Sequence, residues 1–353
     1  MLDHQESIQT PLAPSLPPSW YYSEEQYKAE KENIFKKDWV FLCHTGQIPE
    51  RLNYITCDIA GIPVAVLRDE QDQIQVLLNI CRHRGALLLT EKSGKLAKPM
   101  LMCQYHGWCY HTDGGFKQAP FMSANAELLS LKKVNWVEVN GMIFVNFSAE
   151  PQSFAARKMQ MLQEMDAGGF RAEKYQYHSQ ITRTGWFNWK TWVEGFQECY
   201  HCPTIHTGFN KDFHLSQYKV HNKDHFSVHT CPRKVKSATG SFEGLWMWIF
   251  PNCGLPCYEK VYYSLRVNPK SPTQTELIYT FFTNELFTTE DENTFFEFIR
   301  KITDEDIAIC EQVQKNIEEG TGADLYEHGY LNLDRENGVH YFHELVRMKS
   351  ACV

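Results

Sequence analysis

The stretch Cys81-Arg82-His83-Arg84-Gly85 is followed along the chain by Cys103-Gln104-Tyr105-His106-Gly107-Trp108. Each loop supplies one thiolate and one imidazole, which gives four candidate ligands: Cys81, His83, Cys103 and His106. A zinc finger groups its two cysteines on one arm and its two histidines on the other. Mixed pairs instead suit a [2Fe-2S] cluster with the cysteines on one iron and the histidines on the other. We therefore expect an iron-sulfur cluster here, with a structural zinc ribbon as the alternative.

These two loops resemble the first signature of the Rieske oxygenases, Cys-x-His-Arg-Gly followed by Cys-x-x-His-Gly-Trp, with a slightly longer spacer. Two imidazoles on one iron raise the potential to roughly −150 to +300 mV, against about −400 mV for an all-cysteine cluster. The resemblance implies a partner that delivers electrons, either a ferredoxin or a separate NAD(P)H-dependent flavin/iron-sulfur reductase. This fits the chain, because no Gly-x-Gly-x-x-Gly stretch follows an expected strand.

Composition excludes several classes of protein. The net charge is −8 with no long basic run, which argues against nucleic acid or an anionic membrane surface as partner. No apolar run of about 18 residues is present, so we expect no membrane span. The N-terminus lacks the pattern of a signal peptide. The twelve cysteines are spread along the chain, which favours free thiols in a reducing cytoplasm.

The 353 residues, of which 43% are hydrophobic, are long for one core. We expect an N-terminal helical segment (1–39) packed on the catalytic domain, a small antiparallel β domain (40–150) and a larger domain (151–353). Alternating strands at 54–59 and 64–68 predict the β domain. Later strands and a long helix over 290–318 predict an α+β layer fold with a cavity between sheet and helix. The resemblance implies a Rieske [2Fe-2S] domain and a helix-grip (START-like) catalytic domain with a long C-terminal helix.

A second metal site is indicated by the stretch from Asn188 to His206. His201 and His206 lie about 140° apart on an ideal helix, but Pro203 disfavours helix at Cys202 and lets the chain turn back. Glu198, three residues before His201, shares its helix face. Two histidines and a carboxylate make the facial triad of iron(II) oxygenases. Asp306 is the best carboxylate because it starts an apolar helix face, and Asp304 and Glu305 are the alternatives.

The same residues resemble the catalytic motif of Rieske oxygenases, Glu-Cys-Tyr-His-Cys-x-x-x-His after Asn-Trp-Lys, with Glu-Asp-x-x-x-Cys-Glu on the long helix. The resemblance implies that His201, His206 and Asp306 hold a mononuclear Fe(II). It also implies a head-to-tail homotrimer, in which Glu198 is the carboxylate between the cluster of one subunit and the iron of its neighbour. Two packed core histidines, or a zinc or redox Cys-x-x-Cys pair (Cys199 and Cys202), are the alternatives.

The resemblance implies an oxygenase that uses O2 to hydroxylate, or to N-demethylate, a small organic substrate. The sequence of the catalytic motif is most similar to that of the choline and quaternary-amine monooxygenase branch. Thr207 and Gly195 depart from that branch. Aromatic walls would suit a trimethylammonium group, and the candidate wall residues are Trp192, Phe209, Trp246 and Trp248. An oxygenase that cis-dihydroxylates an aromatic ring or O-demethylates is an alternative, and a Rieske electron carrier that does not oxygenate is a second one. The modest length favours a homotrimer without a small second subunit.

Overall fold

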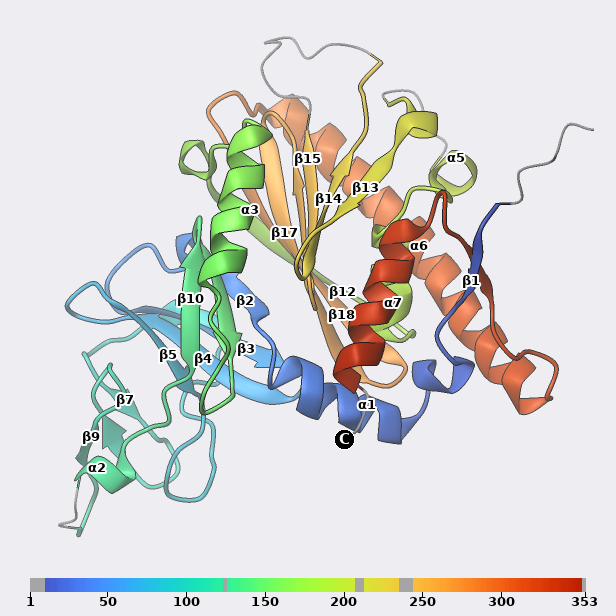
Figure 1. Ribbon diagram of the computed structural model, residues 1–353. Coiled ribbons are helices and arrows are strands. Elements are labelled where there is room, and N and C mark those ends of the chain that lie inside the picture. Colours follow the sequence, from blue (N-terminus) through green and yellow to red (C-terminus); the bar gives the residue numbers. More distant parts are fainter. Residues whose placement is uncertain (1–9, 123–125, 207–212, 235–243, 351–353) are drawn as a thin grey trace, which may run out of the picture.

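The computed structural model describes residues 10–122, 126–206, 213–234 and 244–350 (Figure 1). The cluster-loop region is built from short antiparallel strands in three small sheets. The order β5-β4-β3-β6 joins Ile74–Leu78, Ile62–Arg68, Asn53–Ile59 and Ser93–Lys95. The order β10-β11-β2 joins Asn135–Val139, Met142–Asn146 and Val40–His44, and the order β7-β8-β9 joins Leu101–Met102, Cys109–Tyr110 and Phe116–Gln118. A short helix, α2 (Ala126–Leu129), follows β9.

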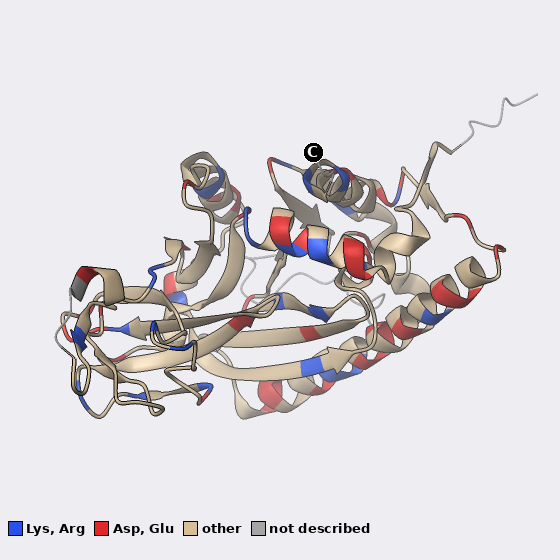
Figure 2. Cartoon of the chain, turned by 90° about the horizontal axis from the view of Figure 1, so that it is seen from below, with Lys and Arg blue, Asp and Glu red and all other residues tan. Residues whose placement is uncertain are grey.

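The larger part of the chain forms a seven-stranded antiparallel sheet of order β12-β18-β17-β16-β15-β14-β13. Its strands, in that order, are Gln176–Gly185, Gln274–Thr283, Val261–Ser271, Cys253–Cys257, Leu245–Ile249, Phe226–Thr230 and Lys219–Asn222. The long helix α6 (Thr289–Gly322) runs along this sheet (Figures 1 and 2). Figure 2 shows acidic and basic residues spread along α6, as expected for a helix with one face in solvent.

Shorter helices complete the fold. They are α1 (Glu24–Glu30), α3 (Ala155–Ala167), α4 (Trp189–Phe196), α5 (Cys202–Ile205) and α7 (Asn337–Ser350). Near the N-terminus, β1 (Leu12–Pro14) pairs with β19 (Tyr330–Asn332). No helix among the described residues combines the length and the apolar character that a bilayer crossing requires.

The α+β expectation is confirmed, including the long helix, which begins at Thr289 with a capping box between Thr288 and Asp291. Sequence patterns missed β13, β16 and α7. Strand β16 contains Gly254 and Pro256, two residues that are depleted in strands, so its local sequence does not predict one. It forms because neighbours on both sides, β15 and β17, supply the ladder.

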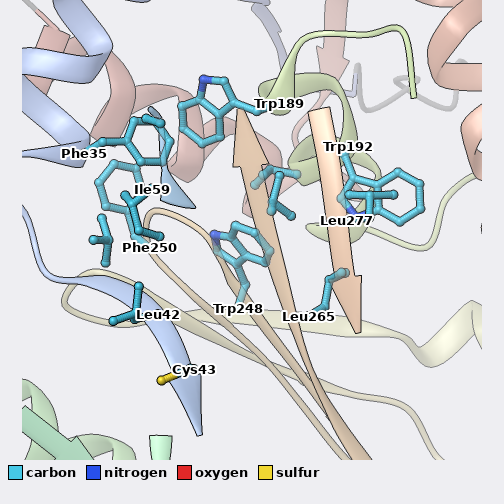
Figure 3. Packing of buried hydrophobic residues seen from close by; sticks show 14 of the residues in the cluster. Phe35, Leu42, Cys43, Ile59, Trp189, Trp192, Trp248, Phe250, Leu265 and Leu277 are labelled. Carbon is cyan, nitrogen blue, oxygen red and sulfur yellow. The ribbon is translucent and has the colours of Figure 1, made fainter. Parts of the chain in front are cut away.

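One hydrophobic core connects the N-terminal segment, the small sheets and the large sheet (Figure 3). Phe35, Leu42 and Ile59 lie in the same buried cluster as Trp189 and Trp248, although they come from all three parts of the chain. A shared core means that the sheets β5-β4-β3-β6 and β10-β11-β2 are positioned against the large sheet by packing rather than by a linker, while the cluster loops pack in a smaller core of their own.

The N-terminal segment is also fixed to α4 by a fully buried ion pair. The Lys190 ammonium donates to Glu30 Oε1 at 2.6 Å and to the carbonyl of Trp20 at 2.9 Å, and neither Lys190 nor Glu30 is exposed. Trp189 donates its indole N–H to the other oxygen of Glu30 at 2.7 Å. Burial works against the charged amine and lowers the pKa of Lys190, while Glu30 opposes this effect.

Replacing Glu30 with Gln should therefore destabilise the protein strongly. The substitution leaves the Lys190 charge buried without its counter-charge, which costs about 3–5 kcal/mol in comparable buried pairs. Thermal and denaturant unfolding would measure the loss. Glu32→Gln is the matched control, because its partner Lys36 is exposed and such surface pairs contribute about 0–1 kcal/mol. Equal stability of both variants would show that the buried pair is not what holds α1 to α4.

Candidate metal centres and substrate cavity

The chain leaves α4 at Phe196 and reaches α5 at Cys202 through a short non-helical link that carries Glu198 and His201. The expectation that Glu198 and His201 share one helix face is therefore wrong, because the helix ends earlier than the proline predicts. Pro203 instead lies in the first turn of α5, where its missing N–H costs nothing. The link still brings Glu198 against His201, whose Nδ1 contacts the Glu198 carboxylate.

His201 and His206 meet Asp306 of α6 at one point. The three ligand atoms all lie within 4.8 Å of one another. Asp306 Oδ1 is 3.0 Å from His206 Nε2 and 3.8 Å from His201 Nε2. The two imidazole rings are nearly perpendicular, with centroids 5.1 Å apart. Two imidazoles and one carboxylate converging from a single side leave the opposite side open for other ligands, which is the arrangement of a facial triad.

Each of these imidazoles also forms a hydrogen bond through Nδ1, the ring nitrogen that does not face Asp306, to a second carboxylate. His206 Nδ1 donates to Glu305 Oε2 at 2.9 Å, and His201 Nδ1 donates to Glu198. A proton held on Nδ1 leaves the Nε2 lone pair free, and in both residues Nε2 is the atom that faces Asp306. Asp304, the other candidate ligand, points away and pairs with Arg183 of β12.

The neighbouring carboxylates also raise the pKa values of the two imidazoles. Burial disfavours the charged form of His201, but Glu198 and Asp306 outweigh it, so the pKa of His201 is raised. The pKa of His206 is raised for the same reason, with Asp306 and Glu305 opposing burial. A cluster that attracts protons this way attracts a divalent cation as well, so the residues fit an iron(II) ion.

The cluster loops show the paired arrangement expected from their sequence. The thiols of Cys81 and Cys103 interact with each other in one buried group, while the rings of His83 and His106 lie 4.6 Å apart. His106 Nδ1 is buried without a hydrogen-bond partner among the described residues, as expected of an atom that ligates a metal. Two thiolates on one side and two imidazoles on the other fit the two irons of a [2Fe-2S] cluster.

Both loops turn through a glycine with positive φ, Gly85 at +75° and Gly107 at +69°. This conformation is strained for any other residue, which explains why glycine follows the ligands. The Tyr110 hydroxyl lies 3.2 Å from the Cys81 sulfur and accepts the Arg82 backbone N–H. Tyr110 therefore fixes the first loop to the strand that follows the second.

A cavity of about 130 Å³ opens beside His201, His206 and Asp306, between the large sheet and α6. Aromatic side chains dominate its wall: Trp192, Phe196, Tyr218, Trp246, Tyr258, Tyr263, Tyr279 and Phe298. Among the described lining residues there is no lysine or arginine, and the carboxylates are those of Glu198 and Asp306. A side chain added at Gly195, which also lines the cavity, would meet open space.

His229 also lines the cavity and is held as a neutral ring. Burial lowers its pKa to about 3. Its two nitrogens lie 2.6 Å from the Tyr218 hydroxyl and 3.1 Å from Gln197 Oε1. An uncharged, fully bonded histidine in this position contributes shape and polarity to the wall without adding a positive charge.

Comparison with known families decides the identity of this arrangement. Residues 38–137 match the Rieske [2Fe-2S] domain, and residues 172–351 match the catalytic domain of the ring hydroxylating alpha subunits. The chain belongs to the ring-hydroxylating alpha subunits. It is thus a Rieske-type oxygenase, the terminal component that binds a [2Fe-2S] cluster in one domain and a mononuclear iron in the other. Such an oxygenase needs a substrate, O2 and a reductase partner, and the alternative of an electron carrier without oxygenation is not supported.

Relatives of this Rieske oxygenase include enzymes named for quaternary amines. The carnitine monooxygenase oxygenase subunit of Escherichia coli (strain K12) is 25% identical over 94% of this chain and 92% of its own length. The glycine betaine monooxygenase oxygenase subunit of Chromohalobacter salexigens is 36% identical, over 54% of this chain and 43% of its own length. A crystal structure of the quaternary ammonium Rieske monooxygenase CntA with an inhibitor has the same fold, with a TM-score of 0.86, 23% identity and 96% of each chain covered.

Only some of the predicted pocket residues of this oxygenase line the cavity. Trp192 and Trp246 line the cavity, with 6% and 8% of their surfaces exposed. Trp248, expected beside them, is 1% exposed and packs behind Phe196 in the core (Figure 3). Phe209 and Thr207 lie outside the described residues.

Sequence patterns missed the tyrosines of the wall, the neutral His229 and the role of Glu305 as partner of His206. Tyr263 and Leu265 lie two residues apart on β17, so alternation could have indicated that they share a face, but not that this face lines the cavity.

Cys199 and Cys202 form a disulfide, with their Cα atoms 5.0 Å apart, on either side of His201. This corrects the expectation that the cysteines outside the cluster site are free thiols, although the other cysteines of the described residues form no disulfide. The bond closes a small ring of residues that contains His201. It therefore restricts the backbone from which this imidazole projects.

Replacing Glu305 with Ala should weaken iron binding without unfolding the protein. Loss of a carboxylate that orients a ligating histidine costs about 10–100-fold in metal affinity. Competition with a chelator, followed by iron quantification, would measure the change. Glu297→Ala, at an exposed position about two turns earlier on α6, is the matched control, and equal affinity in both variants would contradict the role of Glu305.

Proposed function

We propose that this oxygenase oxidises a quaternary amine, using O2 and electrons from a reductase, by hydroxylating a carbon next to the nitrogen so that the C–N bond then breaks. The observation that carries the proposal is the cavity wall. It is aromatic on most sides and, in its described part, carries carboxylates but no cationic side chain. Aromatic faces attract a trimethylammonium group by about 0.5–2 kcal/mol each, and a wall without lysine or arginine does not repel it. The carnitine and glycine betaine oxygenases among the relatives support the same substrate class.

We assign the metals to the residues that the sequence predicted. Cys81, His83, Cys103 and His106 would hold the cluster, while His201, His206 and Asp306 would hold the mononuclear iron. Iron(II) at that triad supplies the activation of O2 beside the substrate. The chain's own residues do the rest: Glu198 and Glu305 hold protons on Nδ1, and the aromatic wall excludes water and orients the ammonium group.

Electrons would pass between neighbouring subunits of a head-to-tail homotrimer. In one chain the small sheet β7-β8-β9 and helix α5 lie at opposite ends of the molecule (Figure 1). Electron transfer falls steeply with distance, so the cluster of one chain serves the iron of another. Exposed aromatic rings beside both sites, Tyr105 at 59% and Tyr200 at 56%, suit such a contact. Glu198 would then accept a hydrogen bond from the neighbour's cluster histidine as well as from His201.

The proposal also covers the domain bounds, the electron donor and the location of the enzyme. The three parts are residues 1–39, 40–150 and 151–353, with the first fixed to the third by the Glu30–Lys190 pair. A separate NAD(P)H-dependent flavin/iron-sulfur reductase or a ferredoxin donates the electrons. Such donors operate where nicotinamide cofactors are kept reduced, so we propose that the enzyme works in the cytoplasm.

Product analysis tests the proposed function. The holoenzyme, supplied with a reductase, NADH and O2, would be offered carnitine, glycine betaine and choline, with an aromatic hydrocarbon as the competing class. We expect one of the amines to gain one oxygen or to lose a carbon fragment as an aldehyde, with matching O2 consumption. A product of the hydrocarbon that gains two oxygens and two hydrogens would replace the proposal with ring dihydroxylation.

Glu198→Gln should retain both metals and lose most turnover. The glutamine amide fills the same space, and its oxygen can still accept from His201 Nδ1 and keep this ligand oriented, but it cannot carry the negative charge that stabilises an N–H on a facing imidazole. Loss of such a group lowers rates by roughly 100-fold or more. Iron and sulfide content would be measured together with turnover, and a variant with full metal content and normal turnover would contradict the bridging role.

Trp246→Leu should raise KM for the quaternary amine by roughly 2- to 30-fold, the equivalent of one cation-π contact, whereas Trp246→Phe should change it less. A neutral analogue with carbon in place of nitrogen separates shape from charge, because its binding should respond equally to both substitutions. Trp136→Leu, on the outer strand β10, is the control. If KM for the cation and binding of the analogue changed in parallel, the aromatic wall would not be recognising charge.

A further inference from the structure

A second reactive group lies away from both metal centres, where the small sheets meet the large one. A cleft of about 500 Å³ separates β3 and its neighbours from strands β12, β17 and β18. Cys43 of β2, Cys57 of β3 and Arg266 of β17 all line it. Figure 3 shows Cys43 on β2, beside the core that the two parts share. Neither cysteine is needed for the cluster or for the mononuclear iron.

The Arg266 side chain is buried, and no acidic residue in the described part of the chain forms an ion pair with it. It is 8% exposed, its Nη1 donates to the Leu42 carbonyl at 2.6 Å, and its Nε has no hydrogen-bond partner among the described residues. The Cys57 sulfur approaches the same Leu42 carbonyl at 3.8 Å, so thiol and guanidinium meet at one point. A buried guanidinium is costly unless a negative charge compensates it.

The carboxylates that line this cleft do not compensate Arg266. The Lys270 ammonium lies 2.9 Å from the Asp58 carboxylate and 3.6 Å from the Glu276 carboxylate, so it forms ion pairs with both. The remaining charged residue of the wall is Lys92, which is positive. The group in contact with Arg266 that can become negative is therefore the Cys57 thiol.

The titration of the two cysteines agrees with this geometry. The Cys43 thiol faces Cys57 and lowers the pKa of Cys57 to about 6, with Arg266 adding to the effect against burial and Asp58. Burial raises the pKa of Cys43, which stays protonated and is the donor of the pair. At neutral pH, above the Cys57 pKa, the site thus holds one thiolate and one thiol side by side.

We propose that Cys57 is a modification site for hydroperoxides, with Cys43 as the thiol that resolves the product into a disulfide between β2 and β3. The Cys57 thiolate attacks one oxygen of hydrogen peroxide, the O–O bond breaks, and Cys57 sulfenic acid and hydroxide form. The Cys43 thiol then displaces the sulfenic oxygen, giving the Cys43–Cys57 disulfide and water. Two electrons leave the sulfurs and reduce the peroxide.

An oxygenase has a source of this oxidant close by. Whenever reduced enzyme transfers two electrons and two protons to O2 without forming product, hydrogen peroxide is released. Cys57 is half-buried and lines the cleft, so a molecule of this size reaches it. Disulfide formation removes the negative charge beside Arg266, which weakens the contact between the cluster-bearing sheets and the large sheet.

The experiment uses the purified holoenzyme and stoichiometric hydrogen peroxide at pH 7. After alkylation without reductant and digestion, mass spectrometry should find the Cys43–Cys57 peptide pair. Cys43→Ser should instead accumulate Cys57 sulfenic acid, which dimedone traps, and Cys57→Ser should give neither product. Cys253 and Cys257, whose pKa values burial raises, should remain reduced and act as internal controls.

A pH series on the unmodified protein keeps the proposal testable if a variant fails to fold. Reaction of Cys57 with a small methanethiosulfonate should be half-maximal near pH 6, well below the value of about 8.5 for an ordinary thiol. Arg266→Gln should shift this midpoint upward and slow peroxide oxidation at pH 7 several-fold, with recovery at about pH 9. A Cys57 that titrates like an ordinary thiol, or that peroxide leaves unchanged while other thiols oxidise, would overturn the proposal.

Discussion

The candidate iron site of this protein depends on two hydrogen bonds between carboxylates and imidazoles. A histidine ring has two nitrogens, and it serves as a metal ligand through one only if the other keeps the proton. Glu198 and Glu305 fix that proton on Nδ1 of His201 and His206, and both Nε2 atoms then face Asp306. The acidic surroundings that raise the pKa of both imidazoles are the same ones that attract a divalent cation.

These hydrogen bonds form only if the segment after α4 is positioned closely against α6, although the two are far apart in the chain. Helix α4 is fixed at its start by the buried Glu30–Lys190 pair and along its length by Glu194, which accepts from Tyr21 and from His343. Helix α6 is fixed near Asp306 by the ion pair of Asp304 with Arg183 of β12. The N-terminal segment and the edge strand of the sheet thus position the metal site without touching it.

Sequence predicted most of the residues that the structure brings together at the two candidate metal centres, because most of them are close neighbours in the chain. Cys81 and His83 sit in one loop, and His201 and His206 in one short segment, so spacing alone restricts their geometry. Asp306 was harder, because Asp304, Glu305 and Asp306 are consecutive. Successive residues of a helix are rotated by about 100°, so the three carboxylates point to different partners. Asp304 pairs with Arg183, Glu305 accepts from His206 Nδ1, and Asp306 faces Nε2 of both histidines.

The cavity wall was predicted only in part for the opposite reason. Its tyrosines come from strands and loops distant in sequence, and alternation within a strand says which residues share a face but not which face meets α6. Alternation correctly places Trp246 and Trp248 on one face of β15, but only Trp246 lines the cavity, because Phe196 packs against Trp248 further along the strand. The Cys199–Cys202 disulfide and the Cys57–Arg266 contact also depend on tertiary structure.

The most direct test of the account mixes two inactive variants. Cys81→Ser should lack the cluster but keep the mononuclear iron, and Asp306→Ala should lack that iron but keep the cluster. Each variant is assayed for metal content and turnover alone, and then after the two are dissociated and reassembled together. If electrons cross from one chain to its neighbour, the mixture should regain a substantial fraction of wild-type turnover. A mixture that contains both metals and stays inactive would contradict electron transfer between subunits, and an Asp306→Ala variant with full iron would contradict the ligand assignment.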